Sequence, residues 1–201
     1  MTEHPSGVRM VRPNLDGLPP LAPAQAALPA GYRLRTYQVG DEAAWATLMN
    51  TGDMGFWDAA ITRDKLTGRP YPQFDPAGLF MVTFGQEEQI VGSACAWLAE
   101  TDETQTGILH MVCVLPAHRG QRLSYVVCLA VLHHFRERGF QRIRLNTGAQ
   151  RPGAVKVYLE LGFQPVYDEP WHPEVWQQIV KQLGWQQPLA PVRASKDAAP
   201  A

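Results

Sequence analysis

The sequence predicts an α+β fold, with a mixed, mostly antiparallel sheet of about six strands flanked by helices. Three strand candidates at 79–84, 90–98 and 107–114 are separated only by short turns, which is typical of an antiparallel meander. A helical pattern at 121–138 precedes a strand at 143–146, so we expect a βαβ unit whose second strand is parallel to the first. A helix at 152–161 and a returning strand at 163–167 follow.

The first 77 residues contain fewer regular patterns. Residues 1–30 are rich in proline and lack apolar periodicity, so we expect a mostly irregular arm in which residues 10–12 could add a short edge contact. Strict alternation at 32–37 predicts a half-buried strand, and Gly40-Asp41 is expected to cap a helix. Residues 50–77 are loop-rich with a short helix at 61–66, and this stretch is either a substrate-contacting region or a surface flap.

The remaining organisation is a single domain at 31–185 that includes a C-terminal helix at 173–183, followed by a disordered tail at 186–201. Composition fits a globular protein, since 45% of the 201 residues are hydrophobic. A net charge of −1 gives no general attraction to nucleic acid or membranes, and no apolar run approaches the ~18 residues of a membrane span. Three cysteines without C-x-x-C spacing indicate free buried thiols in a cytoplasmic protein.

The most informative stretch joins the strand ending at Val114 to the long helix. The apolar run stops at Pro116, a basic turn containing Gly120 follows, and the helix begins near Gln121. The first N–H groups of a helix have no intrahelical partner, and they attract an anion together with the helix dipole. Arg119 and Arg122 both add positive charge there. The turn is therefore predicted to bind a phosphate or pyrophosphate.

The same residues resemble the acyl-CoA signature of the GNAT superfamily of N-acetyltransferases, R/Q-x-x-G-x-G/A. This chain supplies Arg119-Gly120-Gln121-Arg122-Leu123-Ser124, with Arg122 and Ser124 at the two small positions. We expect Arg122 to have a helical φ and still present its N–H. The resemblance covers roughly residues 32–168. It implies a V-shaped splay between the strands that end at Val114 and Asn146, with the cofactor in the V.

The resemblance further implies acetyl-CoA as the acyl donor. Backbone groups of Val112 and Val114 are expected to pair with pantetheine as an added strand does. Asn146 either bonds the pantetheine amides or is an ordinary strand-end residue. The full set of expected cofactor-binding residues is Val112, Cys113, Val114, Arg119, Gly120, Gln121, Arg122, Leu123, Ser124 and Asn146.

Tyr158 is the candidate general acid. It lies in Ala154-x-x-x-Tyr158-x-x-x-Gly162-Phe163, which resembles the family's A-x-x-x-Y-x-x-x-G-F element. In that element the tyrosine often points its hydroxyl at the coenzyme A sulfur. A core aromatic beside Val155 is the alternative interpretation.

The general base has three candidates, Glu100, Asp102 and His110, on or beside the strands leading to the cofactor site. His110 lies four residues before Val114 and is expected to share its face. An imidazole with an ordinary pKa near ~6.5 can accept a proton at neutral pH. A satisfied core histidine and a water relay are the alternatives.

The resemblance therefore implies an N-acetyltransferase that moves an acetyl group directly from acetyl-CoA to the amine of a small molecule. Four acidic residues favour a cationic acceptor: Asp53, Asp58, Glu100 and Asp102. The alternative is a non-catalytic acyl-CoA-binding sensor or interaction module. It is suggested by Arg122 and Ser124 at the small positions, and by a C-terminal helix in place of the last hairpin strand found in many members of the family. No metal is expected, since His133 and His134 point about 100° apart on a helix. The oligomeric state stays open between a monomer and a homodimer.

Overall fold

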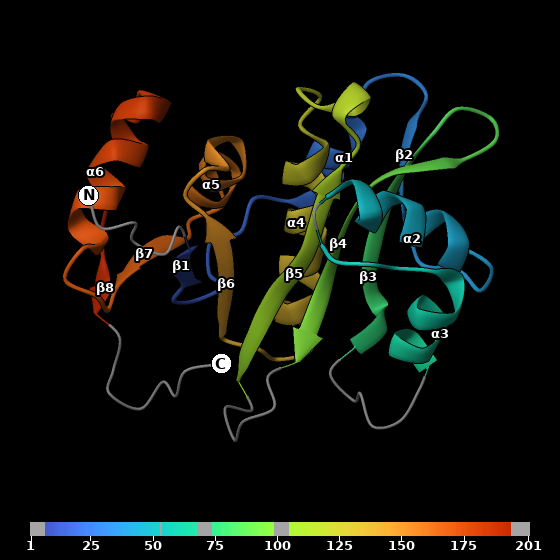
Figure 1. Cartoon of the computed structure of the whole chain (residues 1–201), viewed down its shortest axis with the longest axis horizontal. Coiled ribbons are helices and arrows are strands. Elements are labelled where there is room, and N and C mark those ends of the chain that lie inside the picture. Colours follow the sequence, from blue (N-terminus) through green and yellow to red (C-terminus); the bar gives the residue numbers. More distant parts are fainter. Residues whose placement is uncertain (1–6, 53, 68–73, 99–104, 194–201) are drawn as a thin grey trace. The chain divides into compact units, whose positions relative to one another are not determined.

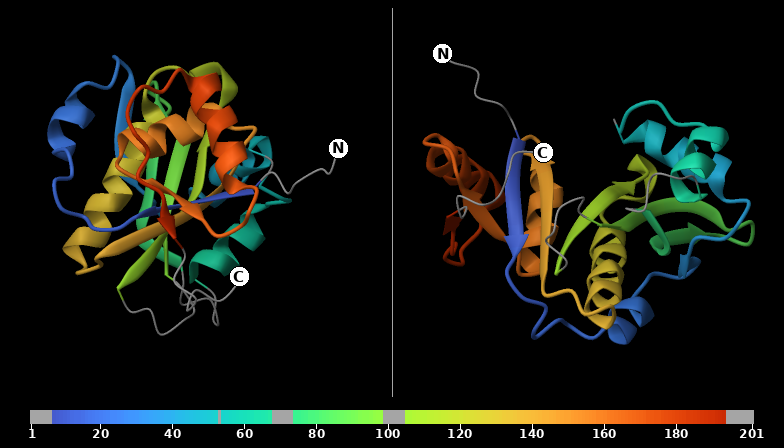
Figure 2. Two further views of the ribbon diagram at one scale, coloured as in Figure 1. Left: turned by 90° about the vertical axis from the view of Figure 1, so that its left-hand side faces the viewer. Right: turned by 90° about the horizontal axis from the view of Figure 1, so that it is seen from below.

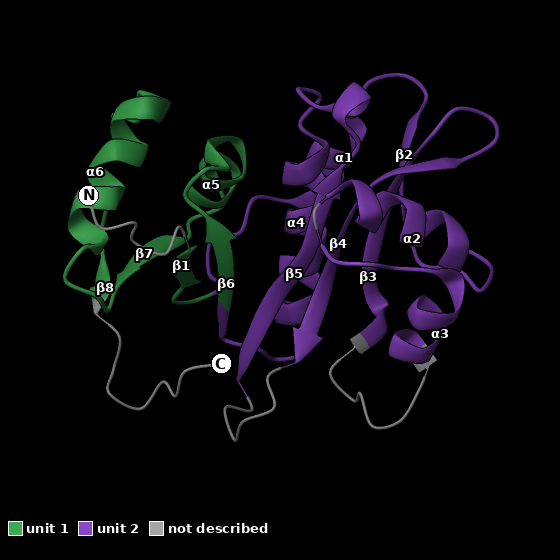
Figure 3. Cartoon of the chain, viewed as in Figure 1, with its two compact units in different colours: residues 1–14, 144–201 green, residues 15–143 purple. Residues whose placement is uncertain are grey.

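The computed structural model describes residues 7–52, 54–67, 74–98 and 105–193. They fall into two compact units, unit 1 with residues 1–14 and 144–201 and unit 2 with residues 15–143 (Figure 3). The domain expected at 31–185 has residues in both units, and its extent as a single domain stays a prediction.

Unit 2 contains the predicted antiparallel meander, which is confirmed. Its strands lie in the order β2 (Tyr32–Thr36), β3 (Phe74–Phe84), β4 (Gln89–Leu98) and β5 (Thr106–Val114) (Figure 1). Each strand pairs with the next in antiparallel register. β3 begins earlier than expected, and its register shifts between Phe74 and Leu79, where Pro76 cannot donate to a ladder.

Helices pack on both faces of this meander (Figures 1 and 2). On one face lies α4 (Leu123–Glu137). Because Gly107 of β5 has no side chain, the Phe135 ring of α4 approaches this strand closely. On the other face α2 (Glu42–Thr51) and α3 (Ala59–Thr67) bury an apolar cluster that includes Trp45 and Trp57. Burial of these large side chains stabilises the unit, at about 25 cal/mol per Å² of apolar surface.

β5 carries a β-bulge that the sequence analysis did not foresee. Ser93 of β4 lies opposite Cys113, whereas Cys95, only two residues further, lies opposite His110. One extra residue of β5 is therefore accommodated, and Met111 there has a φ of 52°.

Unit 1 contains a sheet in the order β6 (Arg142–Gly148), β1 (Gly7–Arg12), β7 (Gln164–Tyr167) and β8 (Val192–Arg193). β1 is antiparallel to β7, with Met10 opposite Pro165, and β8 is parallel to β7. Two helices belong to this unit, α5 (Pro152–Glu160) and α6 (His172–Leu183). The predicted C-terminal helix is thus present, and it buries Trp176 and Ile179.

The N-terminal arm was expected to be mostly irregular, with a possible strand contact at 10–12, and it contains two regular elements. Residues 7–12 form β1, whose Val8 and Met10 are buried, and α1 (Leu21–Ala26) lies beside α4 in unit 2. The prolines that suggested irregularity flank β1 rather than interrupt it. The prediction of a disordered tail is wrong for β8 at 192–193, while residues 194–201 lie outside the described part of the chain.

Candidate functional site

The turn that joins β5 to α4, residues 115–122, lies entirely within unit 2 and is called the β5–α4 turn. The Leu115 N–H continues the strand by donating to the Val91 carbonyl at 2.9 Å. Pro116–His118 form one 3-10 turn, after which Gly120 has a φ of 79° and Arg122 a φ of 58°. These two left-handed residues reverse the chain, so α4 starts at Leu123 and not at Gln121 as predicted.

The start of α4 presents backbone donors. The first helical hydrogen bond runs from the Val126 N–H to the Arg122 carbonyl at 3.2 Å. The N–H groups of Leu123, Ser124 and Tyr125 precede that bond, and no side chain caps the helix. Donors at this end and the positive end of the helix dipole favour an anion.

Two guanidinium groups belong to the same turn. Arg119 donates from Nε to the Val114 carbonyl at 3.2 Å, which ties the turn to the end of β5. The Arg122 guanidinium lies over the Tyr125 ring, 4.4 Å from its centre. Both residues are exposed, and both bring positive charge to the turn that leads into α4.

Arg122 differs from its prediction. It has a left-handed rather than a helical backbone conformation and is the N-cap of α4. A residue other than glycine costs about 1–2 kcal/mol in this region. The signature that this turn resembles has a glycine at this position, and glycine adopts a left-handed conformation without strain. Arg122 adopts the same conformation at a cost in strain.

An aromatic cluster fixes the 3-10 turn to the neighbouring strands. The Tyr32 hydroxyl and His118 Nδ1 are 2.9 Å apart, and the rings of both contact Phe84. The sequence analysis missed this role of His118, since its partners lie 86 and 34 positions earlier in the chain. The cluster holds the turn rigid on β2 and β3.

The residues of β5 and of the start of α4 that were predicted to bind the cofactor differ in solvent exposure. Cys113 is 7% exposed, and its thiol donates to the Leu48 carbonyl at 3.5 Å, so only its backbone is open to a ligand. Val112 and Val114 are half-buried. Gln121 is exposed, Leu123 is buried and Ser124 is half-buried at the start of α4.

His110 lies on a different face from the one predicted. Paired residues of an antiparallel ladder share a face, so His110 lies with Cys95 on the α2 side, whereas Val114 lies with Gly92 on the other side. The bulge at Met111 breaks the alternation on which the prediction depended. The His110 ring packs edge-on against Trp97, with centres 4.9 Å apart. Desolvation by the surrounding protein lowers the pKa of His110. The residue as a whole still has solvent-exposed surface.

Two other predicted residues belong to unit 1. Tyr158 of α5 is 5% exposed, and its ring packs edge-on against Phe163 with centres 5.9 Å apart. Asn146 is an exposed residue of β6. The catalytic role of Tyr158 and the cofactor contact of Asn146 stay predictions, as does the splay between the strands.

Of the acidic residues, Glu100, Asp102 and Asp53 lie outside the described residues. Asp58 accepts the Ile61 N–H at 2.7 Å and so serves the start of α3.

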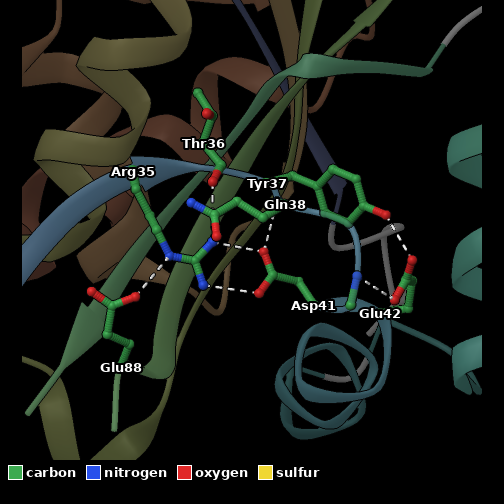
Figure 4. Close-up of polar contacts among 8 residues, drawn as sticks. Arg35, Thr36, Tyr37, Gln38, Asp41, Glu42 and Glu88 are labelled. Carbon is green, nitrogen blue, oxygen red and sulfur yellow. Dashed lines mark hydrogen bonds and ion pairs between the residues drawn. The ribbon is translucent and has the colours of Figure 1, made fainter. Parts of the chain in front are cut away.

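A polar network at the β2–α2 junction was missed (Figure 4). Asp41 is the N-cap residue of α2 as predicted, but its carboxylate makes no capping hydrogen bond, because Arg35 donates to both of its oxygens at 2.6 and 2.9 Å. The Tyr37 hydroxyl donates to the buried Glu42 at 2.7 Å. This bond lowers the pKa of Glu42, while burial and the carboxylate raise the pKa of Tyr37 to about 12. The network stabilises the junction.

Comparisons with known proteins agree with this geometry. The family described as Acetyltransferase (GNAT) family matches residues 44–163. A mycothiol acetyltransferase of Nocardia farcinica is 32% identical over 150 residues, 71% of this chain and 48% of its own. One of Thermobispora bispora is 35% identical over 164 residues, 77% of this chain and 52% of its own. The chain thus spans about half the length of these curated relatives.

A solved structure shares the fold. The GCN5-related N-acetyltransferase from Sphaerobacter thermophilus has a TM-score of 0.61 at 22% identity, covering 79% of this chain and 48% of that chain. Within the described residues, no helix combines the length and the apolar character needed to cross a membrane.

Proposed function

Because the chain belongs to the acetyltransferase (GNAT) family, we propose that it transfers an acetyl group from acetyl-CoA to the amine of a small molecule. The single observation that carries this proposal is the β5–α4 turn. It combines the N–H donors at the start of α4 with the guanidinium groups of Arg119 and Arg122.

The residues of the turn fit the diphosphate of coenzyme A. A Cβ added at Gly120 would meet no atom within 4 Å, so the outer side of the turn has room for a ligand. The N–H groups of Leu123, Ser124 and Tyr125 would hold the phosphate oxygens, and the two arginines would neutralise their charge. The backbone of Val112 and Val114 would pair with the pantetheine amides.

Bound acetyl-CoA supplies an acyl group activated as a thioester. We assign proton acceptance from the attacking amine to His110, because its lowered pKa keeps the imidazole neutral at pH 7. Tyr158 would donate its phenol proton to the sulfur as the carbon–sulfur bond breaks. The Val112 N–H would stabilise the charge that develops on the carbonyl oxygen.

The acceptor is proposed from the relatives. Two of them are named mycothiol acetyltransferases, so mycothiol-related amines are the first acceptors to test. We place the amine on the α2 side of β5, where the rings of His110 and Trp97 pack edge-on.

A non-catalytic acyl-CoA-binding module is the second candidate. The observation that favours it is the strained Arg122 where the family signature has a small residue. Binding of acetyl-CoA without release of free thiol, across a panel of amines that includes mycothiol-related compounds, would support the module. Thiol release with any of these acceptors would support the enzyme.

Titration calorimetry with acetyl-CoA tests the binding site itself. Arg119→Ala and Arg122→Ala are each expected to weaken binding about tenfold or more, since each removes a charge-assisted contact to phosphate. The affinity of the wild type should fall as salt concentration rises. Arg33→Ala, at an exposed arginine of β2, is the control and should leave the affinity unchanged. Equal affinities in all four proteins would contradict the proposal.

A further inference from the structure

A buried serine contacts the bulge of β5. Ser93 of β4 is fully buried, and its Oγ accepts the Nε1–H of Trp45 at 3.0 Å. Its hydroxyl donates in turn to the Met111 carbonyl at 3.2 Å. All three residues belong to unit 2.

The polar character of Ser93 is unusual for its place. The neighbours on the same strand, Ala94 and Cys95, are equally buried and pack without a hydroxyl. A buried hydroxyl is costly unless it is hydrogen-bonded. Ser93 is satisfied as both donor and acceptor, so the strand retains this polar group together with two specific partners.

The contact determines the orientation of one peptide group. The Met111 carbonyl and the Val112 N–H belong to the same planar trans peptide unit, so they point in opposite directions. Because Ser93 draws the carbonyl toward β4, the Val112 N–H points away from Ser93 and from β4. The left-handed φ of 52° at Met111 is strained for a residue with a Cβ, and the hydroxyl contact opposes its relaxation into the regular ladder.

We propose that Ser93, oriented by Trp45, is a positioning residue that aims the Val112 N–H at the carbonyl oxygen of the bound thioester. This inference rests on the proposed function, because the ligand is acetyl-CoA at the same strand. Ser93 itself touches no substrate and acts through the peptide group between Met111 and Val112.

The test compares the affinities for acetyl-CoA and for free CoA, which requires no acceptor. Only acetyl-CoA has the thioester carbonyl, so the wild type should bind it about two- to tenfold more tightly than CoA. Ser93→Ala should lose this preference while its affinity for CoA stays within about twofold. A merely structural role for Ser93 would instead weaken both ligands equally.

Cys95→Ala is the matched control, because Cys95 lies on the same strand and face and is equally buried. It should lower thermal stability but keep the preference for acetyl-CoA. Trp45→Phe removes the Nε1–H donor to Ser93 and keeps an aromatic ring in the buried position, and it should reduce the preference in part. It also carries the test if circular dichroism shows that Ser93→Ala is unfolded.

The outcomes separate the two proposals. A wild type that binds acetyl-CoA and CoA equally, or a folded Ser93→Ala that keeps the preference, overturns the positioning role and leaves the coenzyme A site intact. A wild type that binds neither ligand overturns the proposed function, and the positioning role with it.

Discussion

The imidazole ring of His110 lies edge-on against the indole ring of Trp97, with their planes at 78°. This packing places the histidine on the α2 side of β5, on the same face as Cys113. Desolvation there lowers the pKa of His110 below its ordinary value of about 6.5. The lowered pKa favours the neutral imidazole, which is the form that can accept a proton.

Replacement of His110 tests its assignment as the base. His110→Gln should lower kcat by about 10²- to 10⁴-fold, the usual contribution of a general base. In the wild type, activity should rise with pH and reach half of its maximum below the ordinary histidine pKa of about 6.5, because the group must lose its proton to work and its pKa is lowered. The pH–rate profile and the affinity for acetyl-CoA, which should not change, are the measurements. Full activity in His110→Gln would exclude the residue as the base.

Arg122 offers a paired test of backbone strain and charge. Arg122→Gly and Arg122→Ala both remove the guanidinium, but only glycine adopts the φ of 58° without strain. The glycine variant should therefore be more stable than the alanine variant by about 1 kcal/mol in urea denaturation. Both should lose affinity for acetyl-CoA alike. An alanine variant as stable as the glycine variant would mean that the turn relaxes around the substitution.

The Tyr37–Glu42 contact predicts a pH-dependent stability. The hydrogen bond from Tyr37 lowers the pKa of Glu42, so its stabilisation is present above the ordinary glutamate pKa and is lost as the pH falls through the lowered value. Tyr37→Phe should cost about 1–3 kcal/mol at pH 7. The difference from wild type should shrink below about pH 4. Thr47→Val, which removes a hydroxyl that donates to the uncharged Ala43 carbonyl, is the control and should show no such change at acidic pH.

The elements that were predicted correctly have local signals. The meander is marked by apolar strands between short polar turns, and α4 and α6 by apolar residues at helical spacing. The β5–α4 turn was located because strand, basic turn and helix follow one another directly. These features depend on contacts between residues close in sequence.

The features that were missed depend on distant partners. β1 is a strand because Met10 lies opposite Pro165, and nothing in residues 7–12 alone distinguishes it from an irregular segment. The bulge at Met111 has no glycine to mark it, so the alternation rule placed His110 on the wrong face. The Arg35–Asp41 pair similarly requires the geometry of the β2–α2 junction.

β1 should contribute strongly to stability because its side chains are buried. Met10 is 0% exposed, and Met10→Ala should lower the free energy of unfolding by about 2–5 kcal/mol. Val39→Ala, at a residue that is 92% exposed, should change it by no more than about 0.5 kcal/mol. Denaturation curves for both variants provide the measurement. A loss at Met10 no larger than at Val39 would show that β1 does not belong to the stable sheet.

Tyr158→Phe tests the proposed general acid with the smallest possible change. The substitution removes one hydroxyl and keeps the ring, so its edge-on packing against Phe163 is preserved. If the phenol protonates the departing sulfur, kcat should fall about 10²-fold or more while the affinity for acetyl-CoA is unchanged. The loss of kcat in Tyr158→Phe should then be smaller with acyl donors whose thiol has a lower pKa, since such a leaving group needs less protonation. Unchanged turnover would show that Tyr158 serves only the packing of α5, a role that agrees with its 5% exposure.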